Sequence, residues 1–247
     1  MHKLYDFIEA RERLGTVIEK TKLIHSNVFS DESGNDVYIK PENLQKTGSL
    51  KIRGAYNKIA KLTEDEKTKG VIAASAGNHA QGVAFGAQKL GIKAIIVMPK
   101  HTPLIKIEAT KRYGAEVILF GDVFDDAYVH ARELQKEKGY TFIHPFDDED
   151  VIEGQGTIAL EVLEEVPDAD IILVPVGGGG LISGIAAASK LKNPQIKIIG
   201  VEPEGAASAI EALKNGRVVE LEEANTIADG TAVKRIGDTP FEYIKKY

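Results

Sequence analysis

The chain has 247 residues, of which 43% are hydrophobic and 28% are charged, proportions typical of globular rather than disordered or fibrous proteins. Its formal net charge of -6, with basic and acidic residues interspersed, argues against a nucleic-acid partner, which selects a basic stripe. The absence of cysteine excludes disulfides, thiolate metal sites and a cysteine nucleophile, and it is compatible with a reducing compartment.

The amino-terminal region predicts no targeting segment. Residues 1–13 carry acidic side chains and lack an uninterrupted apolar core, unlike a signal or transit peptide. No apolar run in the sequence approaches the length that spans a bilayer. We therefore expect a cytoplasmic protein with no membrane partner.

Lys51 lies at a predicted helix entrance, within the segment 40–55, which reads KPENLQKTGSLKIRGA. Residues 47–49 (TGS) can begin a helix, so Lys51 falls in its first turn. A lysine that forms a Schiff base must first lose its proton, and a helix start or a nearby phosphate alters its pKa. Spacing alone does not separate this role from that of an ordinary solvated lysine.

From residue 71 onward, short apolar runs alternate with helical periods. The predicted strands are 71–74, 94–97, 116–120 and 141–143, and the predicted helices between them are 78–90, 103–113 and 123–138. After His144 and Pro145 the pattern restarts with a helix at 156–165, a strand at 171–176, a glycine turn, a helix that ends at 191 and a strand at 197–201. This alternation predicts parallel sheets covered on both faces by helices, in two α/β lobes that join near residue 144 around a ligand cleft.

The turn after the first of these strands is a candidate anion site. Residues 75–82 read SAGNHAQG and join a strand to a helix. The side chain of Ser75 or Asn78 can cap that helix. Alternatively, consecutive backbone N–H groups and the Ser75 hydroxyl can hold the carboxylate of a substrate. The residue pattern leaves both interpretations open.

Four consecutive glycines, residues 177–180, separate the strand at 171–176 from the next helix. Such a turn presents free N–H groups at the positive end of a helix, and the absence of Cβ atoms lets a phosphate approach closely. Neither the G-x-G-x-x-G spacing of a dinucleotide site nor the Gly-Lys-Ser/Thr of a Walker loop is present. One or two glycines suit a tight packing turn, so four favour a phosphate site.

The remaining polar residues predict no metal site and no other catalytic motif. None of the six histidines forms a pair with zinc-ligand spacing, and residues 180–184 (GLISG) do not match the G-x-S-x-G elbow. The acidic cluster at 147–150 lacks the EF-hand pattern. We expect no bound metal.

Together, these features predict a cofactor. A lysine can bind an aldehyde covalently, an asparagine can hydrogen-bond its ring, and a glycine-rich turn can hold its phosphate. Lys51, Asn78 and the glycines at 177–180 supply one of each. The combination points to pyridoxal 5'-phosphate chemistry on a small-molecule amino acid.

Four segments carry a family resemblance: 40–55, 75–82, 153–157 (EGQGT) and 174–181 (VPVGGGGL). By these segments the chain resembles the threonine/serine dehydratase family of fold-type II pyridoxal-phosphate enzymes, and within it the short catabolic threonine dehydratases. The resemblance implies a two-lobed α/β fold of the tryptophan synthase β-like kind, with parallel twisted sheets flanked by helices. A small lobe of residues 49–143 would be inserted into a large, phosphate-binding lobe of residues 1–48 and 144–247.

The resemblance also implies roles for individual residues. Lys51 would bind the cofactor covalently and remove the substrate Cα proton, and Asn78 would contact the 3' oxygen of the ring. The phosphate site would consist of Gly177, Gly178, Gly179, Gly180 and Leu181. The substrate carboxylate site would consist of Ser75, Ala76, Gly77, Asn78 and His79. The implied reaction is the deamination of L-threonine, and also of L-serine, to a 2-oxo acid and ammonia.

Two features depart from the family pattern. Leu50 stands where the family has Phe before the lysine, which alters a packing contact. The sequence ends at Tyr247, before the family's Ser-Gly-Gly-Asn-like turn, whose Ser faces the pyridine nitrogen. We therefore expect a large lobe with an uncovered apolar face, a homo-oligomer or partner-stabilised protein, weaker cofactor binding and low turnover.

Two alternative functions remain open. Serine racemases resemble the chain in outline but carry a second Ser where it has Ala76. They also have a cation site, which Glu202 matches, whereas Ser208 stands where an Asp is expected. Both differences favour the dehydratase. The other alternative is a truncated, non-catalytic remnant that binds the cofactor or a partner.

Overall fold

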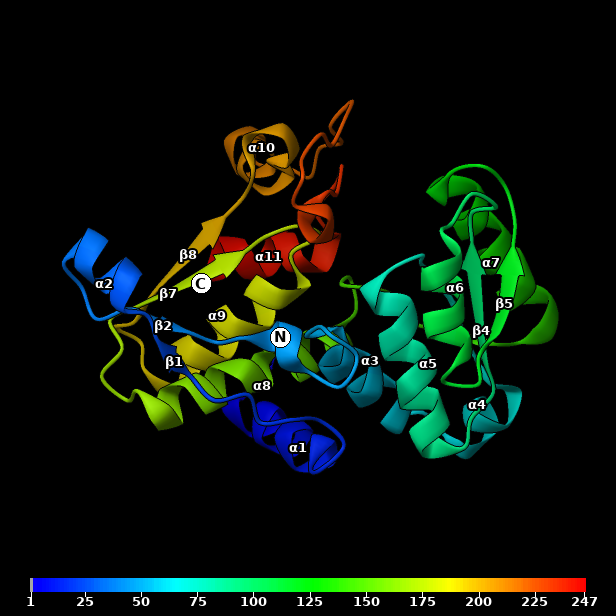
Figure 1. Cartoon of the computed structure of the whole chain (residues 1–247), viewed down its shortest axis with the longest axis horizontal. Helices are drawn as coiled ribbons and strands as arrows, with labels where there is room; N and C mark the ends of the chain where they lie inside the picture. The colour runs from blue at the N-terminus through cyan, green and yellow to red at the C-terminus, as the bar shows by residue number, and fades with distance from the viewer. Residues whose placement is uncertain (1) are drawn as a thin grey trace.

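Two separate parallel sheets organise the molecule, one in each of the two masses visible in Figure 1. The computed structural model describes residues 2–247. Its helices are α1 (Leu4–Leu14), α2 (Asn27–Ser33), α3 (Lys51–Ala60), α4 (Glu64–Lys69), α5 (Asn78–Leu90), α6 (Leu104–Lys111), α7 (Phe124–Lys138), α8 (Glu149–Glu165), α9 (Gly180–Lys192), α10 (Ser208–Asn215) and α11 (Asp238–Lys246). Its strands are β1 (Ile24–His25), β2 (Tyr38–Ile39), β3 (Val71–Ala74), β4 (Ala94–Met98), β5 (Glu116–Leu119), β6 (Thr141–Phe142), β7 (Ile171–Pro175) and β8 (Lys197–Val201), of which β1 and β2 form an antiparallel pair.

The sheet β5-β4-β3-β6 is parallel throughout, and its central strands β3 and β4 are buried on both faces. Alternate residues of a strand point to opposite faces, so Val71 and Ala73 pack with the α5 side chains, whereas Ile72 and Ala74 pack with those of α7. The strands predicted from residue 71 to residue 143 are confirmed to within one residue at each end.

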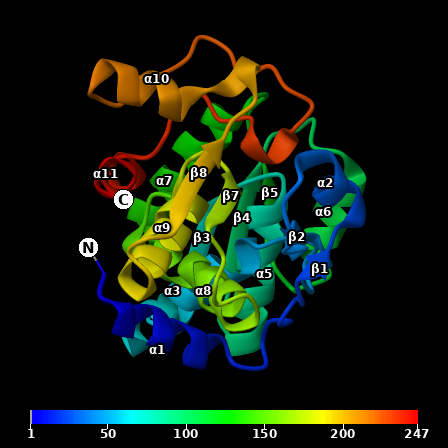
Figure 2. The same ribbon diagram turned by 90° about the vertical axis from the view of Figure 1, so that its left-hand side faces the viewer.

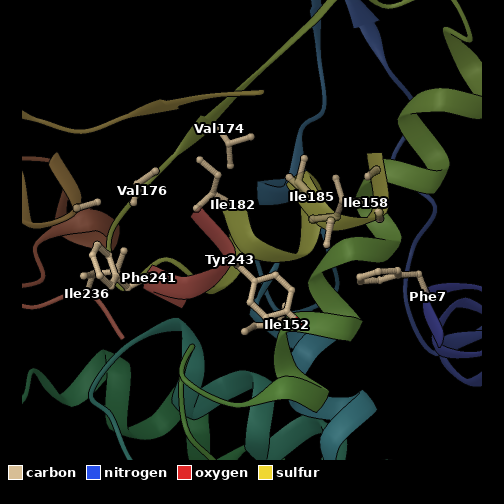
Figure 3. Close-up of a cluster of buried hydrophobic side chains, with 14 of the residues drawn as sticks. Phe7, Ile152, Ile158, Val174, Val176, Ile182, Ile185, Ile236, Phe241 and Tyr243 are labelled. Atoms are coloured by element: carbon tan, nitrogen blue, oxygen red, sulfur yellow. The ribbon is translucent and has the colours of Figure 1, made fainter. Parts of the chain in front are cut away.

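The pair β7-β8 is also parallel, but only one of its faces is covered. Val174 and Val176 belong to the core that α8, α9 and α11 complete, which Figure 3 shows. The outer face presents side chains with exposed fractions of 43–65%: Ile171, Leu173, Ile199 and Val201. Among the described residues, the expectation of helices on both faces is therefore wrong for this pair. The uncovered apolar face that we expect in the large lobe is present.

Helix α8 begins at Glu149 rather than at residue 156, where the sequence pattern places its start. The Asp148 carboxylate accepts hydrogen bonds from two N–H groups of the first turn, at 2.9 and 3.2 Å, and so caps the earlier start. Glycine is unfavourable inside a helix, yet a Cβ at Gly154 would lie 2.6 Å from the carbonyl oxygen of Arg53. The glycine is needed where α3 crosses α8.

Helix α1 lies alongside α8, as Figures 1 and 2 both show. No element is predicted before residue 47, although Phe7, Ala10 and Leu14 form a buried face with helical spacing. The Phe7 side chain lies so close to Gly156 that a Cβ there would collide with the ring. The spacing of these apolar residues is the signal that predicts α1.

Helix α3 connects the two masses, packing against α5 on one side and α8 on the other (Figure 1). The approach of α5 is closest at Gly82, where a Cβ would lie 3.0 Å from the backbone carbonyl carbon of Lys51. Helix α3 therefore starts in a position that both neighbours constrain.

Candidate active site

Lys51 is the first residue of α3, and no charged group within residues 2–247 forms an ion pair with its amine. The expectation that Lys51 falls in the first helical turn is confirmed, although the N-cap is Leu50 and no side chain caps the helix. The backbone N–H of Lys51 donates to the Ser49 hydroxyl at 3.4 Å. The half-buried side chain donates from Nζ to the carbonyl oxygen of Pro145 at 2.8 Å. Burial lowers the pKa of Lys51 from 10.5 to about 8. The neutral form of the amine, which is the nucleophilic form, is therefore populated near physiological pH.

Two neutral imidazoles lie close to this amine. The His79 Nε2 atom is 2.8 Å from the carbonyl oxygen of Ile143, which can only accept, so Nε2 carries the proton. Burial, and then the charge of Lys51, lower the pKa of His79 to about 3. The Nδ1 atom of His144 accepts from the N–H of Asp147 at 2.8 Å, and burial lowers the pKa of His144 to about 4. Neither ring competes with Lys51 for a proton at neutral pH.

The turn at 75–79 supports both interpretations that its sequence leaves open. The Ser75 hydroxyl accepts hydrogen bonds from the N–H groups of Gly77 and Ala80, at 3.2 and 3.3 Å, and thereby holds the turn. The N–H groups of Asn78 and His79 have no acceptor among residues 2–247. Asn78 is exposed, whereas the His79 side chain points into the core. The free donors for an anion are therefore backbone groups.

The glycine-rich loop provides a second and larger set of free donors. Within the described part of the chain, no acceptor contacts the N–H groups of residues 177–182. Gly179 has φ +90°, a conformation that side-chain-bearing residues rarely adopt, and it precedes the first turn of α9, where Leu181 lies. An anion with several oxygen acceptors would satisfy these donors at the positive end of the helix. The residues present therefore fit a phosphate group.

One short segment contacts all three motifs. The junction segment (residues 143–147) follows β6 and leads into α8. Its Ile143 carbonyl accepts from His79 of the first turn, and its Pro145 carbonyl accepts from Lys51. Its Phe146 packs against Gly178 and Gly180, so that a Cβ on Gly180 would lie 2.8 Å from the Phe146 carbonyl oxygen. The lysine, the 75–79 turn and the glycine-rich loop, far apart in sequence, thus converge here.

A buried ionic network around Arg53, two residues after Lys51 in α3, is not predicted from the sequence. The Arg53 side chain is 0% exposed and lies 2.8 Å from Glu42 and 2.6 Å from Glu161. Lys40 adds a second cation 2.6 Å from Glu161. Burial alone would lower the pKa of Arg53, but the hydrogen bonds and charges of the two carboxylates outweigh it and raise it. An arginine on the buried face of a helix signals carboxylate partners, although it does not identify them.

Leu50 packs against the core around α8 and α9, and together with residues of β7 it lines a pocket of about 210 Å³. The described residues contain no group of His, Cys, Asp or Glu side chains that could hold a metal ion. Glu202 instead caps α10, accepting from the N–H groups of Ala209 and Ile210 at 2.8 and 2.9 Å.

No helix within residues 2–247 combines the length and apolarity that crossing a membrane requires.

The comparisons with known proteins agree on one family. The family described as "Pyridoxal-phosphate dependent enzyme" matches residues 14–247. The L-threonine ammonia-lyase of Thermotoga maritima is 54% identical over 247 residues, which are 100% of this chain and 62% of that protein. The chain thus spans less than two thirds of that relative's length.

Solved structures give the same fold. The processed form of threonine deaminase isoform 2 from Solanum lycopersicum superposes with a TM-score of 0.95 at 44% identity, covering 98% of this chain and 71% of that one. Maize serine racemase also superposes with a TM-score of 0.95, at 38% identity, covering 98% of this chain and 74% of that one. The fold-type II expectation is confirmed.

Proposed function

The chain belongs to the pyridoxal-phosphate dependent enzyme family, and on that premise we propose that it deaminates L-threonine to a 2-oxo acid and ammonia with pyridoxal 5'-phosphate. The observation that carries the proposal is Lys51. Its side chain is half-buried, its amine lacks an ion-pair partner among the described residues, and burial lowers its pKa to about 8. A lysine in that state can bind an aldehyde covalently and exchange protons.

Each motif has a part in this proposal. When bound, the cofactor supplies an electron sink for negative charge at the substrate Cα. The free N–H groups of residues 177–181 hold the phosphate, and those of Asn78 and His79 hold the substrate carboxylate. The Asn78 amide is available to hydrogen-bond the ring. The Lys51 Nζ atom removes the proton from Cα and holds it.

We also propose a division into lobes, an oligomeric state and a cellular location. The lobe division at 49–143 follows the two sheets, and homo-oligomerisation would cover the apolar outer face of β7-β8. Sedimentation velocity should then show a species larger than a monomer, and a monomer would contradict the proposed homo-oligomer.

A cytoplasmic location fits the cysteine-free sequence, and cell fractionation tests it.

The proposal is tested by combining an activity assay with chemical trapping. Protein supplied with pyridoxal 5'-phosphate should release equal amounts of 2-oxo acid and ammonia from L-threonine. Borohydride reduction followed by peptide mass mapping should place the pyridoxyl group on Lys51, because the lowered pKa of Lys51 makes its neutral, nucleophilic amine available near physiological pH. An adduct only on Lys46 or Lys58 would contradict the assignment. An adduct on Lys51 without 2-oxo acid would instead support the non-catalytic alternative.

Serine racemisation is the second candidate, favoured by the superposition with the maize enzyme. Ala76 is half-buried in the 75–79 turn, and its methyl group cannot carry a proton. L-Serine should therefore yield pyruvate without D-serine above background, measured by chiral chromatography. The Ala76→Ser variant should produce D-serine slowly, because its hydroxyl adds a proton donor. D-serine from the unaltered protein at a rate comparable to that of pyruvate would refute this argument.

A further inference from the structure

The junction segment connects the two binding motifs through one aromatic residue, Phe146. A Cβ added to Gly178 would collide with its ring, so ring and loop are in direct contact. A Cβ on Gly180 would lie 2.9 Å from the Phe146 Cα and Cβ atoms, so the backbone of Phe146 also touches the loop. The same ring has its centroid 6.0 Å from the Lys51 Nζ atom. One residue therefore contacts the glycine-rich loop and lies beside the lysine amine.

Polar contacts on both sides keep Phe146 in this place. The Nδ1 atom of His144 accepts from the N–H groups of Phe146 and Asp147, at 3.4 and 2.8 Å, and this fixes the turn. The Asp147 carboxylate accepts from the N–H groups of Asp238 and Thr239, both at 3.0 Å, at the start of α11. The preceding residue is held as well, because the Pro145 carbonyl accepts from Lys51. The turn is thus fixed at three successive positions.

We propose that Phe146 is a positioning residue that sets the separation between the Lys51 amine and the glycine-rich loop; this inference rests on the proposed function. A ligand bound covalently at one end and through its phosphate at the other tolerates little change in that separation. Misplacement of reacting groups by about 1 Å can cost about 10²-fold. A smaller side chain at residue 146 would leave a cavity below Gly178, into which the loop could shift.

The test compares two aldehydes that differ only at the phosphate. Pyridoxal 5'-phosphate engages both Lys51 and the loop, whereas pyridoxal engages Lys51 alone. Binding is followed by visible absorbance, and the Lys51 adduct is verified by borohydride reduction and mass mapping. The unaltered protein should prefer the phosphorylated aldehyde strongly. In Phe146→Ala this preference should fall by at least about tenfold, while pyridoxal capture changes less.

Matched variants separate positioning from general destabilisation. Phe146→Tyr retains the ring and should restore the preference, and Phe146→Leu, which retains more volume than alanine, should give an intermediate value. Phe7→Leu truncates another large-lobe aromatic, away from the junction segment, and should lower thermal stability without changing the preference. If Phe146→Ala does not fold, the comparison of Phe146→Leu with Phe7→Leu decides the question.

The two possible failures are distinguishable. An unchanged preference in the Phe146 variants, with a normal Lys51 adduct, overturns the positioning role alone. The absence of any adduct on Lys51 in the unaltered protein overturns the proposed function and this inference with it.

Discussion

Replacing Lys51 with alanine should reduce threonine deamination by at least about 10³-fold, because the substitution removes both the covalent attachment point and the base. Its Nζ atom hydrogen-bonds only the Pro145 carbonyl among the described residues, so its loss leaves no buried charge unpaired. The thermal unfolding midpoint should therefore change little. Lys46→Ala is the matched control, since Lys46 is exposed and lies 3.5 Å from Glu19. Activity of Lys51→Ala within tenfold of the control would exclude the role.

The same lysine should be recognisable by its pH dependence in cofactor-free protein. Because burial lowers the pKa of Lys51 to about 8, the neutral fraction rises through that pH instead of 10.5. Acylation at limiting reagent, quantified by mass mapping, should accordingly show a midpoint near pH 8 for Lys51. A midpoint above pH 10 would mean that the amine is solvated.

Replacing Arg53 with alanine should destabilise the fold by about 3–5 kcal/mol, the cost of removing one partner from a buried ionic network. Glu42 and Glu161 would remain buried, with Lys40 as the remaining close cation of Glu161. Urea denaturation followed by circular dichroism measures the loss. The exposed Arg112 provides the control, and Arg112→Ala should shift the free energy of unfolding by less than about 0.5 kcal/mol. Equal effects of the two substitutions would contradict the network's contribution.

The pH dependence of stability provides an independent check on this network. Burial raises the pKa of Glu161, but hydrogen bonds and charges from Arg53 and Lys40 outweigh it and hold the pKa below 4.5. A carboxylate with a depressed folded-state pKa contributes stability above its unfolded pKa and loses it as the pH falls through the folded value. The unaltered protein should therefore lose stability below about pH 4.5, and Arg53→Ala should lose less in that range.

The alternating part of the fold was predictable because each strand there is an apolar run followed by a helical period. The strand at 71–74 and the helix at 78–90 match β3 and α5 residue for residue. Helix α8 was predicted too short, because its glycines face close neighbours that only the tertiary structure reveals. Local patterns describe what a segment can form, and they do not describe what approaches it.

In the candidate site, too, some residues could be selected from local sequence patterns and others depend on tertiary contacts. The glycine-rich loop stands out in the sequence because four consecutive glycines exceed what a packing turn needs, whereas Lys51 is singled out only by its combination with that loop and by the family resemblance. Phe146 does not stand out, since an aromatic residue after His144 and Pro145 has no distinctive spacing. Its contact with Gly178 depends on how α8 and α9 pack together. Candidate residues that are proposed for their chemistry could therefore be selected from the sequence, whereas a residue that is proposed for its position could not.

Because α1 packs against α8, part of α1 can reach its final packing only after a much later segment of the chain has been made. Arg13 of α1 lies 3.1 Å from Glu153 of α8, across a separation of 140 residues. The strand pairs of the four-stranded sheet, by contrast, all join residues between 71 and 142. Contacts between distant residues form slowly, and chains fold from the amino terminus as they emerge from the ribosome. The Phe7 face of α1 must therefore wait, exposed to water, until α8 has been made and covers it, whereas Leu14 packs with Ile52 and Tyr56 of α3.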